Sequence, residues 1–239
     1  MPPKTPDRFS MIVFGISLLG LVLLTVLTFG VPATLVVLSQ QRLLTGSVFV
    51  AICVLGMVAA LYPSRCSGVL RFGKDKGERP HVKGAGTSGV GFAGHHPACS
   101  GFSSHVFRIG GKVLCAGCTG LVAGAVVSIA GSIPYLLLGF DVGGAGAPIF
   151  WGGFIGVACG LLPHSLLDLR RASVRLSLNF VFVFGAFLLL VGVNDITGNA
   201  AVVIFLLALI VYWIYARIML SRQEHRRICA NCRLSECPL

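Results

Sequence analysis

Cysteine and histidine side chains gather in one short stretch of this chain. Cys115 and Cys118 form a C-x-x-C pair, and Cys99 and His105 lie within the sixteen residues that precede it. Thiolate sulfur and imidazole nitrogen are typical zinc ligands, and both sulfurs of a C-x-x-C pair can reach a single ion. The stretch therefore predicts a metal site with these four residues as ligands. Zinc is the expected ion, and iron is the second choice because no tight four-cysteine run is present.

Other residues offer a different fourth ligand, a supporting partner or a second site. His96 lies in the same stretch as an alternative to the histidine named above. His164 and Asp168 share one helix face at i, i+4 spacing, so they either end a helix at the membrane interface or support the ion as a carboxylate–histidine pair. A second cluster near the C-terminus contains His225, Cys229, Cys232 and Cys237. It could bind its own ion, join the C-x-x-C pair, or form a basic or palmitoylated tail without metal.

The C-x-x-C pair itself has two further interpretations. It opens an apolar helix, and a helix N-terminus favours the thiolate form, so the pair could be a redox-active dithiol. Alternatively, the two side chains could only pack against the helix end. These readings stay open alongside the metal site.

The composition indicates a membrane protein. Of 239 residues, 55% are hydrophobic and only 11% are charged, whereas soluble domains carry about 25% charged residues. Six apolar stretches approach the roughly 20 residues that a membrane span needs. They are Phe9 to Thr28, Leu44 to Leu61, Cys115 to Phe140, Pro148 to Leu162, Leu176 to Val193, and Ala200 to Leu220. We therefore expect an all-α, polytopic transmembrane helical bundle of about six spans, with the lipid bilayer as its surroundings.

The spans divide the chain into four regions. We expect an N-terminal transmembrane hairpin over 1–63, a glycine-rich and basic loop with the Cys/His cluster over 64–112, a four-span core over 113–220, and a cysteine-rich tail over 221–239. The first span is too long for a signal-peptide core, so we expect it to be retained. The loop and the tail are expected in the cytoplasm.

The charges predict the orientation. With six spans, 18 of the 19 Lys and Arg residues fall on one side, and only Arg42 falls on the other. The positive-inside rule then predicts a multi-pass protein of the cell membrane with both termini in the cytoplasm. This arrangement explains the net charge of +11 without nucleic acid. No cysteine falls in an outer loop, so structural disulfides are not expected.

Small residues predict how two spans pack. Glycines at i, i+4 spacing let helix backbones approach closely in lipid. They are Gly120 and Gly124 in the third span, and Gly152, Gly156 and Gly160 in the fourth. We therefore expect these spans to form a tight antiparallel pair, which would place the C-x-x-C pair beside His164 and Asp168.

Two segments carry a family resemblance. The first runs from Cys99 through C-A-G-C-T-G at 115–120, and the second runs from Pro163 through R-L-S-L-N at 175–179 to Gly185. Together they resemble a family of small predicted membrane proteins of unknown function, whose motif is a Cys-His pair, an Arg-Ser, and then C-A-R-C-T-G at a helix start. Ser100 stands where that family has histidine, and Gly117 replaces its arginine. The resemblance supports the site and implies no activity.

Three function classes follow. The first is a non-catalytic protein whose closed metal site orders the long loop and docks a cytoplasmic protein partner. The second is a membrane metalloenzyme or thiol-redox protein that uses the Cys115 and Cys118 centre. No catalytic residue is assigned, so whether the chain is an enzyme stays open, as does homo-oligomer formation. The third, a transporter, is disfavoured: with Arg217 counted to the tail, the spans carry no charged residue for an ion pathway.

Overall fold

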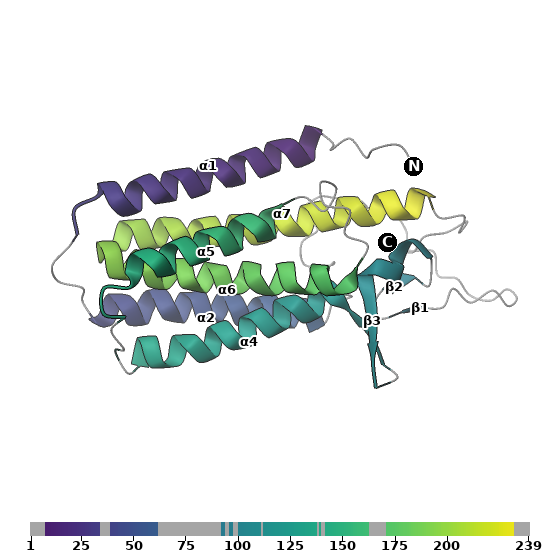
Figure 1. Cartoon of the computed structure of the whole chain (residues 1–239), viewed down its shortest axis with the longest axis horizontal. Helices are drawn as coiled ribbons and strands as arrows, with labels where there is room; N and C mark the ends of the chain where they lie inside the picture. Colours follow the sequence, from purple (N-terminus) through teal and green to yellow (C-terminus); the bar gives the residue numbers. More distant parts are fainter. Residues whose placement is uncertain are drawn as a thin grey trace, which may run out of the picture.

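The computed structural model describes residues 8–33, 39–61, 92–93, 96–97, 100–110, 112–137, 139, 142–162 and 171–231. These residues form a helical bundle with two small antiparallel hairpins at one end (Figure 1). The helices are α1 (Arg8–Gly30), α2 (Ser39–Leu61), α4 (Ala116–Leu137), α5 (Gly146–Leu161), α6 (Ala172–Thr197) and α7 (Ala200–Asn231). The hairpins pair β1 (Phe92–Ala93) with β2 (His96–Pro97), and β3 (Val106–Ile109) with β4 (Lys112–Cys115). A 3-10 helix, η1 (Ser100–His105), precedes β3.

Five of these helices, α1, α2, α4, α6 and α7, are long and apolar enough to cross a membrane. This confirms the prediction of a multi-pass, all-helical membrane protein. The fourth predicted span corresponds to α5, which has 16 residues. At 1.5 Å per residue it extends about 24 Å, which is less than the roughly 30 Å hydrocarbon core. Most of the predicted loop over 64–112 lies outside the described residues.

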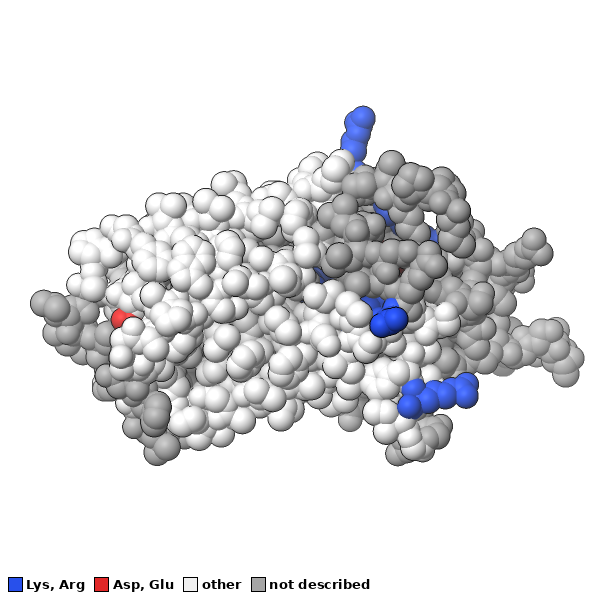
Figure 2. Space-filling model, viewed as in Figure 1, with Lys and Arg blue, Asp and Glu red and all other residues white. Residues whose placement is uncertain are grey.

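Successive helices run in opposite directions along the bundle, so α1 begins and α7 ends at the same end (Figure 1). The β3–β4 hairpin and the start of α4 lie there too. On the face drawn in Figure 2, the Lys and Arg side chains gather toward this end. We call it the basic end, and the opposite end, where α2 begins with Arg42 in its first turn, the far end.

Helix α6 is the centre of the packing, since α4 and α5 both pack against it and make few contacts with one another. The predicted tight pairing of the third and fourth spans is therefore wrong. Most of the predicted glycines do permit close approach, but toward α6: a Cβ atom on Gly156 would lie 3.0 Å from the Val181 oxygen, and one on Gly124 would lie 2.8 Å from the Phe180 oxygen. Gly152 is the exception, since a Cβ atom there would lie 3.8 Å from a Leu188 methyl group, whereas its neighbour Gly153 meets the α6 backbone. The glycine spacing identified the contact faces correctly, but the spacing carries no information about which helix covers them.

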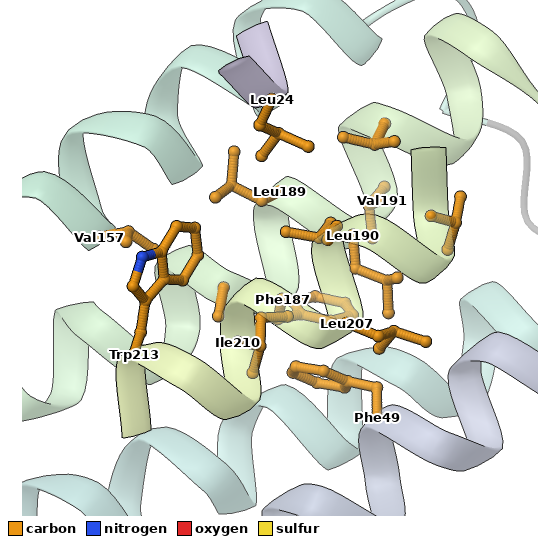
Figure 3. Close-up of a cluster of buried hydrophobic side chains, with 14 of the residues drawn as sticks. Leu24, Phe49, Val157, Phe187, Leu189, Leu190, Val191, Leu207, Ile210 and Trp213 are labelled. Atoms are coloured by element: carbon orange, nitrogen blue, oxygen red, sulfur yellow. The ribbon is translucent and has the colours of Figure 1, made fainter. Parts of the chain in front are cut away.

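The hydrophobic core lies around α6 and takes side chains from α1, α2, α4, α5 and α7 (Figure 3). Trp213 of α7 and Phe49 of α2 are among its largest fully buried side chains. Leu189 of α6 and Val157 of α5 are also fully buried there. The core is wholly apolar in the labelled region of Figure 3, apart from the indole nitrogen of Trp213.

Two helices extend further than the sequence predicted. α7 continues to Asn231, past the expected end at Leu220, and α6 begins at Ala172, before the expected Leu176. Both extensions bring charged residues, among them Arg175 and Glu224, into the helices. These two side chains form an ion pair that joins α6 to α7.

The packing around α6 gives a stability prediction. Gly153→Ala is expected to destabilise the protein by about 1–3 kcal/mol, because the added methyl group must displace the α6 backbone. Gly15→Ala is the matched control, since a Cβ atom there meets nothing within 4 Å and alanine favours the helix. Thermal unfolding in detergent measures both variants. Equal midpoints for the two would contradict the close contact between α5 and α6.

Candidate metal and thiol site at the basic end

The β3–β4 hairpin delivers the two cysteines to the start of α4. Val106 pairs with Cys115, and the turn contains Gly110, whose positive φ of 54° suits glycine. β4 ends at Cys115 and α4 begins at the next residue, so Cys118 lies in the first helical turn. The thiols of Cys115 and Cys118 share a hydrogen bond and are both half-buried. The structure therefore brings together the pair that the sequence singled out.

The thiol pair lies against the start of α6. A Cβ atom on Gly117 would be 3.9 Å from the Cys115 sulfur and 3.6 Å from the Asn179 Nδ2 atom. The side chains of Cys115 and Asn179 therefore both border the space that a side chain at Gly117 would occupy. Asn179 donates a hydrogen bond of 2.8 Å to the Arg175 carbonyl and accepts one of 2.6 Å from the Arg217 guanidinium. Through Asn179, the thiol pair is placed next to α7 as well as α6.

His105 lies in a separate cluster between η1, α6 and α7. Its side chain is 7% exposed, and its ring centroid is 5.5 Å from that of Phe102 and 5.6 Å from that of His225. Its Nε2 atom is 3.8 Å from a Glu224 carboxylate oxygen. Phe102 is only 2% exposed, so η1 is anchored to the bundle by two buried rings. The structure thus unites His105 with His225 of the predicted C-terminal cluster.

An ion pair holds this cluster together. Arg175 of α6 donates two hydrogen bonds to Glu224 of α7, with lengths of 2.8 and 3.2 Å. Such a bidentate pair is stronger and more directional than a single charged hydrogen bond. Arg217 also lies over the ring of Phe182, 5.1 Å from its centroid. Because buried charges are costly unless paired, these contacts allow three charged side chains to remain within the bundle.

The predicted ligands are only partly brought together. Within the described residues, no three Cys, His, Asp or Glu side chains are arranged to hold one ion. His96 is placed in β2 and Cys229 in α7, but the surroundings of their side chains are not described. Cys99, His164, Asp168, Cys232 and Cys237 lie outside the described residues.

Sequence reasoning missed the polar residues around the predicted site. These are Arg175, Asn179, Arg217 and Glu224. A spacing signal was present, because Arg175 and Asn179 are four residues apart on α6, whereas Arg217 and Glu224 are seven apart on α7. Both spacings place the members of a pair on one helix face. The span boundaries assigned Arg175, Arg217 and Glu224 to a loop and the tail, and Asn179 was given no role although it lies in the R-L-S-L-N segment of the resemblance.

Neither protein-family models, nor curated proteins, nor solved structures gave a match to this chain. The resemblance to small predicted membrane proteins therefore stays a prediction from the motifs.

The ion pair between α6 and α7 is testable by a double-mutant cycle. Glu224→Gln is expected to cost at least about 2 kcal/mol of unfolding free energy, because it leaves the guanidinium of Arg175 without its anion. Arg175→Gln combined with Glu224→Gln should cost less than the sum of the two single changes. Arg222→Gln, on the same helix, is the control and should change little. Strict additivity of the two single changes would refute a direct interaction.

Proposed function

We propose that this multi-pass membrane protein holds a structural metal ion, zinc in the first place, at the basic end of its bundle. The observation that carries the proposal is the contact between the Cys115 and Cys118 thiols at the start of α4. Two sulfurs in contact can both bind one ion. The hairpin and α6 fix this pair before any ion binds, so little ordering is needed on metal binding.

Chain connectivity supports Cys99 as the third ligand. It immediately precedes η1, and the buried rings of Phe102 and His105 hold η1 against the bundle. Only six residues lie between Cys99 and Val106, which is paired with Cys115. This short connection supports Cys99 as the third ligand.

The fourth ligand is the least determined part of the proposal. His105 was the first choice from the sequence, but its ring is packed among Phe102, His225 and Glu224. Binding an ion at the thiol pair would require the ring to leave these contacts. We therefore propose that the fourth ligand is His96 or one of the C-terminal cysteines Cys229, Cys232 and Cys237.

The orientation belongs to the same proposal. The basic end faces the cytoplasm by the positive-inside rule, and the reducing cytoplasm keeps the thiols available for metal. In support of the charge pattern, Arg42 is the one described basic residue at the far end.

A docking role is favoured over catalysis. The β3–β4 hairpin exposes apolar side chains at the basic end: Ile109 is 63% exposed, and Leu114 is exposed as well. Figure 1 shows this hairpin projecting from the side of the bundle. A rigid hairpin with an apolar surface, fixed by a closed metal site, suits the binding of a cytoplasmic protein.

The thiol contact also favours a second candidate, a thiol-redox protein. Exchange with a partner's disulfide would form the Cys115–Cys118 bond, and the two electrons and two protons would pass to the partner's sulfurs. This candidate needs a free thiol pair, whereas the first needs a metal-bound pair. Metal content therefore separates them.

The metal proposal is tested by elemental analysis of protein purified under reducing conditions. We expect about one zinc per chain in the wild type and its loss in Cys115→Ser and Cys118→Ser. Cys159→Ser is the matched control, because this half-buried thiol lies in α5, which makes few contacts with α4. Wild-type protein without metal would overturn the proposal. Reversible protection of both thiols from alkylation after oxidation would then favour the redox candidate.

His105→Phe tests the assignment of the fourth ligand. Phenylalanine keeps a ring among Phe102 and His225 but cannot bind metal. We expect the variant to retain zinc as the wild type does, with a similar thermal midpoint. Loss of zinc in a variant that still folds would show that His105 is a ligand after all.

A further inference from the structure

An apolar groove of about 190 Å³ opens on the side of the bundle near the far end. It exists because α4 and α5 both pack on α6 but leave space between one another. Its floor is formed by α6, and its lining includes Pro134 and Tyr135 of α4, Ile149 of α5, and Leu188 of α6. Pro134, Tyr135 and Ile149 lie in the last or first turn of their helices, so in a membrane this groove would lie near the bilayer surface.

A cation lies beside this groove. The guanidinium carbon of Arg42 is 5.5 Å from the centroid of the Tyr135 ring, and Tyr135 is part of the groove lining. Tyrosine and arginine side chains often lie at the membrane–water interface, where an apolar stem and a polar end are both accommodated. The groove therefore joins an apolar wall to a positive charge.

The described residues around Arg42 do not balance its positive charge. It lies in the first turn of α2, which contains no acidic residue, and a helix N-terminus already carries a partial positive charge. Within the described part of the chain, its buried Nε atom has no hydrogen-bond partner and no carboxylate forms an ion pair with it. Asp195, the α6 acid at this end, contacts Gly146 instead.

We propose that this groove binds an anionic phospholipid, with an acyl chain against α4, α5 and α6 and the phosphate paired with Arg42. Guanidinium and phosphate form bidentate hydrogen bonds, which suit an arginine at the membrane interface. The acyl chain fills the apolar groove between α4 and α5. A lipid bound through both its phosphate and its acyl chain gives Arg42 a role. Among the described residues, Arg42 is the one basic residue at the far end.

A second groove provides an internal comparison. It lies between α2 and α7, has a volume of about 340 Å³, and is lined by Leu44, Val48, Ile204 and Ala208 among others. The lining contains no charged residue. Any lipid that it holds should therefore bind without preference for an anionic headgroup.

Native mass spectrometry of the full-length protein in detergent tests the proposal. The probes are phosphatidylglycerol and phosphatidylcholine with identical acyl chains. We expect phosphatidylglycerol to bind at least about fivefold more tightly, and Arg42→Gln to remove this preference. Arg42→Lys should keep most of it. Arg8→Gln, a cation at the basic end, should leave it unchanged.

A steric variant tests the groove itself. Leu188→Trp, which fills the groove, should weaken phosphatidylglycerol binding, whereas Ala208→Trp in the second groove should not. Equal binding of the two lipids, or a preference that survives Arg42→Gln, would overturn the proposal. A preference lost in Ala208→Trp but kept in Leu188→Trp would also overturn it, because it would place the lipid in the other groove.

Discussion

The close approach of α4 and α5 to α6 determines the rest of the structure. In lipid, helices gain little from burying apolar surface against one another, so association depends on close packing of backbones and on polar contacts. Glycines at the contact faces remove the side chains that would hold the helices apart, and Gly185 of α6 meets Gly153 and Gly156 of α5. This contact fixes α6 as the central helix. This packing also explains the thiol site and the apolar groove. α4 brings the cysteines next to α6, and because α4 packs on α6 it leaves a space beside α5.

Charged residues also determine how the helices pack at the basic end. Arg175 and Glu224 join α6 to α7, and the same carboxylate lies near His105 on η1. An ion pair of this kind contributes little net stability compared with apolar packing. It does disfavour any other arrangement of the helices, because that arrangement would leave a buried charge unpaired. Its value here is positional, since the shared carboxylate determines where η1 packs against α6 and α7. The thiols and the cluster are thus two parts of one surface, connected through Asn179.

Much of the fold was accessible from the sequence, because the bilayer imposes strong limits on length and composition. Apolar runs located five long helices and α5 to within a few residues at most ends. The ends of α6 and α7 were missed because hydropathy stops at the first charged residue, whereas a helix with paired charges continues. The partner helix was predicted wrongly because glycines such as Gly156 and Gly124 indicate which face of a helix is in close contact, but not which helix it contacts.

Within the candidate site, the thiols of Cys115 and Cys118 lie in contact, as C-x-x-C spacing at a helix start favours on local geometry alone. The position of His105 depends instead on tertiary contacts with Glu224 and His225, more than a hundred residues later in the chain. No local pattern encodes those contacts. Ligands that depend on long-range packing are therefore the ones that spacing arguments could not assign.

The most direct test of the central claim is zinc-edge X-ray absorption of the protein purified under reducing conditions. Three or four sulfur neighbours at about 2.3 Å would agree with a closed site built on Cys99, Cys115 and Cys118. A first shell of nitrogen and oxygen alone would contradict the account, because any zinc present would then be bound away from the thiol pair.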